Sequence, residues 1–281
     1  MASIPSRVSD RLAKGIKTFQ PIIQSAKARD VNESDTVIIV TDMLCYLFGY
    51  EKYSEITSEY AIRGTYCDLA TKLDGRVQCL VEVKSIGTEL KDSHVRQAVD
   101  YAVNLGVEWV ALTNGMAWRI YKVCFGKPVT QEIVVEFNFL DLNPKNDQHL
   151  ESLFLLAKEG WTRSAIGDYH IQQQALSRYS LAAAVLSDYV LAAVRHELRR
   201  MSPDVRIDLP QIKAALAQEV LKREVMEGDK ADEARRRLNR ADLKASRQKA
   251  ANNNGSDTDA EPTVPEQKQP AEVAVADKSQ K

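Results

Sequence analysis

The sequence predicts an α/β protein, in which a mixed central sheet flanked by helices is followed by an all-helical extension and a disordered tail. In the first half of the chain, short runs rich in Val and Leu alternate with helical segments and are separated by turns containing Gly and Asn. From Asp147 onward the apolar residues recur with a period of about 3.6. Beyond Ala250 large apolar side chains almost disappear, which is typical of a segment that cannot form a core.

These changes of pattern divide the 281 residues into four segments. Residues 1–30 are expected to form a helical segment, and residues 31–142 the α/β domain. Residues 143–249 are expected to form the helical extension, and residues 250–281 the tail. A chain of this length can form one large domain or two modest ones.

The α/β domain opens with a helix. Residues from Glu33 to Phe48 have apolar side chains at helical spacing and stop at Gly49, a residue type that commonly ends helices. Asp74-Gly75 and Asn114-Gly115 are turn signals, each lying between two runs typical of strands. Strands are expected at Ser54–Ile62, Thr65–Leu73, Val77–Val83, Val107–Thr113, Ala117–Cys124 and Val129–Phe139, with a helix capped by Asp92 or Ser93 that runs to about Leu105.

The extension is expected to be helical throughout. Its small residues around Ala182–Ala184 allow close helix packing, within the chain or in a homo-oligomer. Its last helix is strongly basic and is a candidate surface for nucleic-acid phosphates, although a solvated charged face is the more common explanation. The expected helices are Gln148–Lys158, Gly167–Met201, Leu209–Glu227 with Asp208 as N-cap and Pro210 in the first turn, and Asp229–Lys249 with Arg235, Arg236, Arg237, Arg240, Lys244, Arg247 and Lys249.

The composition is that of a globular protein, with 44% hydrophobic and 27% charged residues. A net charge of −1 gives no overall attraction to nucleic acid, so DNA binding would need a local basic face. The four cysteines form no C-x-x-C pair and are expected to be reduced core residues. The most apolar run, Leu181–Val194, is interrupted by Asp188 and shorter than the ~20 residues of a membrane span. Without a signal-peptide pattern either, the sequence predicts a soluble cytoplasmic protein with no membrane contact.

A carboxylate and an ammonium at the end of one expected strand form the candidate site. Side chains alternate faces along a strand, so Glu82 and Lys84 share a face while Val83 points into the core. Asp68, on the preceding strand, adds a second carboxylate. Two carboxylates supply the hard oxygen ligands that Mg²⁺ prefers, and a lysine can position a water or offset charge on a phosphate.

The E-x-K spacing alone is not specific. Glu89/Lys91 and Glu266/Lys268 have the same spacing, but they fall in an expected loop and in the tail. The competing explanation of Glu82 is an ion pair at the strand edge, with Lys84 or Arg76, worth only ~0–1 kcal/mol. On the residue pattern alone, the two explanations are equally supported.

The register of the hairpin decides whether Asp68 and Glu82 can meet. A two-residue Asp74-Gly75 loop pairs Asp68 with Val81 and sends Glu82 to the other face. A three-residue loop that also includes Leu73 pairs Asp68 with Leu80, so that Asp68, Glu82 and Lys84 share one face. The catalytic interpretation therefore predicts the three-residue turn, and the two-residue register would contradict it.

The order and spacing of several motifs resemble the PD-(D/E)XK nuclease superfamily, and within it the N-terminal nuclease domain of the restriction subunit of type I restriction–modification enzymes. The likeness extends over roughly residues 30–140. It rests on Tyr66-Cys67-Asp68-Leu69-Ala70, Cys79-Leu80-Val81-Glu82-Val83-Lys84 and Gln97-Ala98-Val99-Asp100-Tyr101-Ala102, with Glu33-Ser34-Asp35-Thr36, Leu47-Phe48-Gly49-Tyr50, Glu59-Tyr60 and Leu112-Thr113-Asn114-Gly115 in support.

This resemblance implies a restriction-endonuclease-like fold and Mg²⁺-dependent cleavage of DNA, with Mn²⁺ as a possible substitute. Asp68 and Glu82 match the metal-binding acids, Lys84 the catalytic lysine, and Gln97 the glutamine of a Q-x-x-x-Y helix motif. Glu33 matches a helix glutamate that some members add near the metal.

The chain departs from the superfamily pattern in two ways. Cys67 stands where the superfamily name has proline. No G-x-x-x-x-G-K-[ST] phosphate loop occurs, so the ATP-driven motor of a type I restriction subunit is not expected. The resemblance implies a nuclease module in restriction, phage defence or DNA processing. The alternative is a catalytically silent nuclease fold that binds DNA or a partner protein.

Overall fold

The computed structural model of the chain describes residues 3–62 and 65–253, and these fall into two compact units. The first unit ends at Ala175 and the second begins at Leu176. The expected tail, residues 250–281, lies outside the described residues from residue 254 onward.

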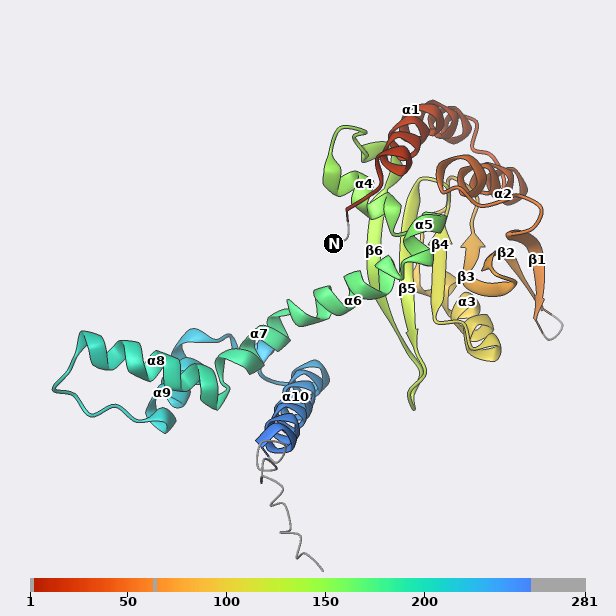
Figure 1. Cartoon of the computed structure of the whole chain (residues 1–281). Coiled ribbons are helices and arrows are strands. Elements are labelled where there is room, and N and C mark those ends of the chain that lie inside the picture. Colours follow the sequence, from red (N-terminus) through yellow and green to blue (C-terminus); the bar gives the residue numbers. More distant parts are fainter. Residues whose placement is uncertain (1–2, 63–64, 254–281) are drawn as a thin grey trace, which may run out of the picture. The chain divides into compact units, whose positions relative to one another are not determined.

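The first unit contains a six-stranded sheet whose strands follow one another in sequence order (Figure 1). β3 and β4 are parallel and all other neighbours are antiparallel, so the expected mixed sheet is confirmed. Parallel neighbours need a crossover connection, and the helix α3 (Asp92–Leu105) provides it. The strands are β1 (Ile56–Ile62), β2 (Thr65–Leu73), β3 (Arg76–Val83), β4 (Trp109–Thr113), β5 (Ala117–Cys124) and β6 (Thr130–Asn138).

Helices cover both faces of the sheet, so β4 and the second part of β3, from Cys79 to Val83, are buried on both sides (Figure 1). On one face lie α1 (Ser6–Ala28), α2 (Glu33–Asp42) and the π-helical turn η1 (Met43–Leu47), which pack against the larger core cluster. On the other face α3 packs against a second cluster. β3 contributes to both, with Val81 and Val83 in the first and Leu80 in the second.

Three further helices belong to the first unit, although the sequence groups them with the helical extension. They are α4 (Asp147–Phe154), α5 (Lys158–Thr162) and α6 (Ala165–Ala175), and α4 follows the 3-10 turn η2 (Phe139–Asp141). Leu153, Phe154 and Trp161 are buried in the larger core cluster. Arg11 of α1 also forms an ion pair with Glu159 of α5, with 2.6 Å between Nη2 and Oε2. The boundary between the units therefore falls after residue 175, because these helices bury their apolar sides against the sheet's core.

The second unit is helical, but its first helices are shorter than expected. The prediction of one helix over Gly167–Met201 is wrong, because Ser177 and Ser187 each begin a new helix by accepting a backbone N–H three residues on. Asp208 is confirmed as an N-cap. The elements are α7 (Arg178–Val185), α8 (Asp188–Met201), α9 (Leu209–Ala215), the π-helical turn η3 (Leu216–Val220), the 3-10 turn η4 (Arg223–Val225) and α10 (Asp229–Asn253). None of the helices in the described ranges is both long and apolar enough to span a bilayer.

Candidate active site

The turn between β2 and β3 differs from the prediction. Leu73 pairs with Arg76, so the loop consists of two residues, Asp74 and Gly75, both with positive φ (50° and 75°). Two consecutive left-handed residues form the tight turn whose twist suits a hairpin, and Asp-Gly is a favoured pair for it. The predicted three-residue turn is therefore wrong.

A β-bulge then changes the register of the same hairpin. Lys72 pairs with Val77, whereas Thr71 pairs with Cys79, so Gln78 is an extra residue on β3. From there the pairs continue through Ala70 with Leu80 and Leu69 with Val81, which brings Asp68 level with Glu82. Residues that are level on neighbouring strands share a face. The bulge thus restores the side-by-side placement of the two acids that a continuous two-residue register would have removed.

Asp68 is paired with neither neighbouring strand, because the β2–β3 ladder ends just before it, at Leu69, and the β1–β2 ladder skips it, passing from Leu69 to Cys67. The residue opposite, Glu59, has the left-handed φ of 47°, which is uncommon for a residue other than glycine. Asp68 uses its side chain instead: its Oδ2 accepts the backbone N–H of Val83 at 2.7 Å. This bond fixes the carboxylate beside the end of β3.

Lys84 joins the acids into one cluster. Its Nζ lies 2.8 Å from Oε1 of Glu82 and 3.6 Å from Oε2 of Glu33, the first residue of α2. Glu82 is only 2% exposed, and its other oxygen, Oε2, is buried without a hydrogen-bond partner among the described residues. The structure therefore brings together four of the residues that the sequence selects: Glu33, Asp68, Glu82 and Lys84.

Burial and mutual repulsion disfavour the ionised forms of the carboxylates in this cluster. Burial raises the pKa of Asp68, although the Val83 N–H and Lys84 act in the other direction. Burial also raises the pKa of Glu82; the hydrogen bond from Lys84 opposes this and the charge of Asp68 adds to it. For Lys84 burial alone would lower the pKa, but the bond to Glu82 and the surrounding carboxylates outweigh it and the pKa is raised. Lys84 thus stays protonated, but its single positive charge does not offset the burial that raises the pKa values of Asp68 and Glu82.

These donors fit a divalent cation in their chemistry. Glu33 and Glu82 form ion pairs with Lys84, and Asp68 interacts with it electrostatically, so the three ionised carboxylates and one ammonium have a formal charge of −2. The unpartnered Oε2 of Glu82 and the carboxylate of Asp68 are hard oxygen donors of the kind that Mg²⁺ prefers. The arrangement is not a complete metal cage, since the described part of the chain contains no group of three His, Cys, Asp or Glu side chains placed to bind one ion. Asp68 and Glu82 are the residues that could hold the cation, with Glu33 nearby through Lys84.

Gln97 does not join this cluster through a direct bond. It is exposed on α3, and its amide Nε2 donates to Oη of Tyr101, one turn later, at 2.7 Å. Within the described ranges no hydrogen bond links it to Asp68, Glu82 or Lys84. The Gln97–Tyr101 pairing expected from their spacing of four residues is present.

Asn114 is a residue that the sequence indicates as part of a turn and of a motif supporting the resemblance, with no role of its own. Its side chain is buried, and its amide Nδ2 donates to the carbonyl oxygens of Ile86 and Thr88 at 3.3 and 2.9 Å. Its Oδ1 accepts the N–H groups of Met116 and Ala117. Asn114 thus ties the β4–β5 turn to the loop that begins directly after Lys84. Turn propensity identifies the residue, but no local pattern reveals the distant loop that it holds.

A comparison with protein-family models found that residues 33–136 match the family described as type I restriction enzyme R protein N terminus (HSDR_N). The match confirms the resemblance expected from the sequence. It includes Glu33, Asp68, Glu82, Lys84 and Asn114, and ends before the second unit. Neither the search of curated proteins nor the search of solved structures found a match.

Proposed function

We propose, from the match of residues 33–136 to the family of type I restriction enzyme R protein N termini, that the first unit is a metal-dependent endonuclease that hydrolyses phosphodiester bonds of DNA. The observation that supports this most directly is the meeting of Asp68, Glu82 and Lys84 at the end of β3, despite a turn that by itself would separate them. The biological role would be restriction, phage defence or DNA processing.

Each side chain has a role in this proposal. Asp68 and Glu82 would hold Mg²⁺ or Mn²⁺ through their carboxylate oxygens, and Val83 N–H keeps the Asp68 carboxylate in place. A bound divalent cation supplies Lewis-acid polarisation of the phosphate and lowers the pKa of a water. Lys84, positioned by Glu82, would orient that water or offset the charge that develops on the phosphate. Glu33 helps to keep Lys84 protonated.

The decisive experiment is a cleavage assay with supercoiled plasmid and linear DNA in Mg²⁺ or Mn²⁺. We expect Lys84→Met and Asp68→Asn each to reduce cleavage by at least about 10²–10³-fold, the loss seen when one preorganised charge-stabilising group is removed. EDTA should stop the wild-type reaction. The matched control is Glu89→Gln/Lys91→Met, which alters the other E-x-K pair of the described chain, at the exposed end of the β3–α3 loop, and should cleave like the wild type.

The folding of each variant is checked by circular dichroism, so that loss of activity is not loss of structure. Cleavage that survives in folded Lys84→Met and Asp68→Asn protein would remove the proposal, because both groups are needed for it. Equal loss in the Glu89/Lys91 control would remove the assignment of the site to β3.

A catalytically silent nuclease fold is the second candidate, and two observations favour it. No three-ligand metal group is formed among the described residues, and Gln97 is bonded to Tyr101 instead of to the acids. This candidate predicts salt-dependent DNA binding by the wild type with no turnover in either metal. The same assay, combined with a binding measurement, separates the two.

A further inference from the structure

The helix α10 in the second unit carries a line of basic residues. Arg236, Arg240, Lys244 and Arg247 follow one another at spacings of four, four and three residues. At 3.6 residues per turn, these spacings place all four within a sector of about 80° around the helix. We call these four residues the α10 stripe.

The stripe faces away from the packed side of its helix. All four residues are exposed, whereas Ala231 and Ala234, on the opposite side of α10, are buried. α10 packs against α7 within this unit. The side chains of the stripe are therefore available to a partner and are not needed to hold the helix in place.

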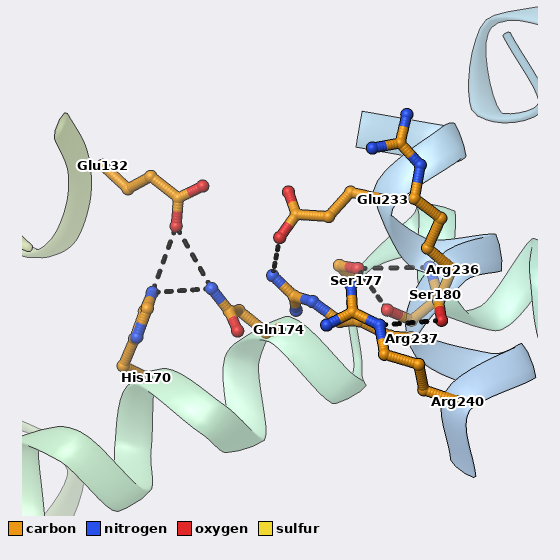
Figure 2. Close-up of polar contacts among 9 residues, drawn as sticks. All are labelled: Glu132, His170, Gln174, Ser177, Ser180, Glu233, Arg236, Arg237 and Arg240. Atoms are coloured by element: carbon orange, nitrogen blue, oxygen red, sulfur yellow. Dashed lines mark hydrogen bonds and ion pairs between the residues drawn. The ribbon is translucent and has the colours of Figure 1, made fainter. Parts of the chain in front are cut away.

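The neighbouring arginines are paired, but the stripe is not. Arg235 and Arg237 form ion pairs with Asp232 and Glu233. Figure 2 shows Arg237 directed to Glu233, while Arg236 and Arg240 lie on successive turns and are linked only by the bond from Arg240 Nε to the Arg236 carbonyl at 3.3 Å. No ion pair in the described ranges involves a stripe residue. The one acid between Ala234 and Gln248, Asp242, lies on a different side of the helix.

We propose that the α10 stripe binds the sugar–phosphate backbone of duplex DNA without reading base sequence. Its four cations extend over about 16 Å of helix, a length over which one DNA strand carries about five phosphates. Arg and Lys are the residues that pair best with phosphate oxygens. The choice of DNA rests on the proposed function of the first unit; the charge pattern itself is what specifies a polyanion.

The test is the salt dependence of binding, measured with the full chain and a fluorescent duplex of about 30 base pairs in EDTA, where no cleavage can occur. The stripe variant changes Arg236, Arg240, Lys244 and Arg247 to Gln, which keeps helix propensity. The control variant changes Arg200, Lys222, Arg223 and Lys230 to Gln, removing the same charge from exposed positions of the same unit.

We expect the stripe variant to bind at least about 100-fold more weakly at 0.1 M salt, and its log K against log [salt] slope to shrink by about 3–4, since each phosphate contact contributes about 0.9. The control should lose less than about threefold. Wild-type affinity in the stripe variant would overturn the inference, and so would equal losses in both variants, which would show only a general charge effect.

Further measurements separate this inference from the proposed function. Stripe-dependent DNA binding in a protein that cleaves nothing supports the stripe and contradicts the nuclease. Cleavage with no stripe-dependent binding does the reverse. Preferential, stripe-dependent binding of an RNA duplex of equal length would overturn the assignment to DNA. Far-UV circular dichroism of both variants shows whether α10 keeps its helix.

Discussion

Burial of the Glu82 carboxylate is energetically unfavourable for the folded chain, which points to a role for this residue other than stability. Its carboxylate is nearly fully buried, one oxygen has no partner among the described residues, and Asp68 lies close enough to raise its pKa further. Burying a charge is unfavourable unless it is paired and fully hydrogen-bonded. Lys84 satisfies only one of the two oxygens. Buried carboxylates with perturbed pKa values cluster at functional sites.

The raised pKa of Asp68 predicts how the free energy of unfolding depends on pH. The folded-state pKa is raised, so the stability that Asp68 contributes is fully present below the unfolded pKa of about 4 and is lost as the pH rises through the folded pKa. Asn cannot ionise, yet its side-chain oxygen can still accept the Val83 N–H. We therefore expect Asp68→Asn to be more stable than the wild type at pH 8 in EDTA, and no more stable near pH 4.

Urea denaturation at the two pH values measures this difference. Asp100→Asn, at an exposed position on α3, is the matched control and should show no such gain. A wild type whose stability relative to Asp68→Asn rises between pH 4 and pH 8 would contradict the prediction. Together with the cleavage assay, a variant that is more stable but inactive would mark Asp68 as a residue kept for chemistry and not for folding.

For single residues, the spacing along the sequence predicts part of the site. Asp68, Glu82 and Lys84 can be selected from strand alternation and composition, because a strand fixes which side chains share a face. The placement of Glu33 beside Lys84 depends on how α2 packs against β3, which spacing cannot supply. Gln97 shows the opposite case: its helix and its neighbour Tyr101 are as expected, but its amide is used in a bond along the helix.

Among the elements, the β2–β3 hairpin shows why a register is hard to predict. Asp74-Gly75 correctly indicates a turn, and both strands lie close to their expected bounds. The extra residue is Gln78, and neither it nor its neighbours is a Gly or Pro that would mark a bulge. The sequence therefore supports a continuous ladder. A one-residue shift moves every later side chain to the other face, and the whole site depends on it.

The β3–α3 loop gives the next prediction, which concerns Asn114. Asn114→Ala removes the donors to Ile86 and Thr88 and leaves a buried carbonyl oxygen of Ile86 unpaired, which costs about 1–3 kcal/mol. Because the loop starts directly after Lys84, we expect cleavage to fall more than DNA binding. The unfolding midpoint in urea and the cleavage rate at saturating DNA measure the two effects.

A second substitution separates the loop from the turn. Asn114→Asp keeps an oxygen for the N–H groups of Met116 and Ala117 but has no donor for the loop. If the loop contacts matter, Asp is as damaging to cleavage as Ala; if only the turn matters, Asp restores the wild-type rate and the prediction fails. Asn104→Ala, at an exposed position on α3, should leave stability within about 0.5 kcal/mol of the wild type.

For the whole molecule, the two units differ in how much core they contain. Both core clusters lie entirely in the first unit, with residues from Val8 to Ile166. The buried apolar residues of the described second unit are few and mostly small: Ala182, Leu191, Ile212, Ala231 and Ala234. The sequence correctly predicts a sheet domain followed by helices. The compact units divide after residue 175, whereas the sequence suggests a boundary after residue 142, because amphipathic helices such as α4 have the same local pattern whether they cover a sheet or pack on other helices.

This distribution of core predicts that residues 1–175 fold without the rest of the chain. The fragment retains both clusters, all six strands and the Arg11–Glu159 ion pair, so the interactions that hold the first unit together are all present in it. We expect a cooperative unfolding transition with a free energy of unfolding within about 1 kcal/mol of the corresponding transition in the full chain, measured by urea denaturation.

A fragment ending at residue 142, the boundary suggested by sequence, lacks α4–α6 and the buried Leu153, Phe154 and Trp161. Its free energy of unfolding should fall by several kcal/mol, or it should fail to fold. Equal stability of the two fragments would show that these helices are not part of the first unit's core.

The 1–175 fragment also lacks α10, so it should keep any Mg²⁺-dependent cleavage at saturating concentration while its DNA affinity falls to that of the stripe variant.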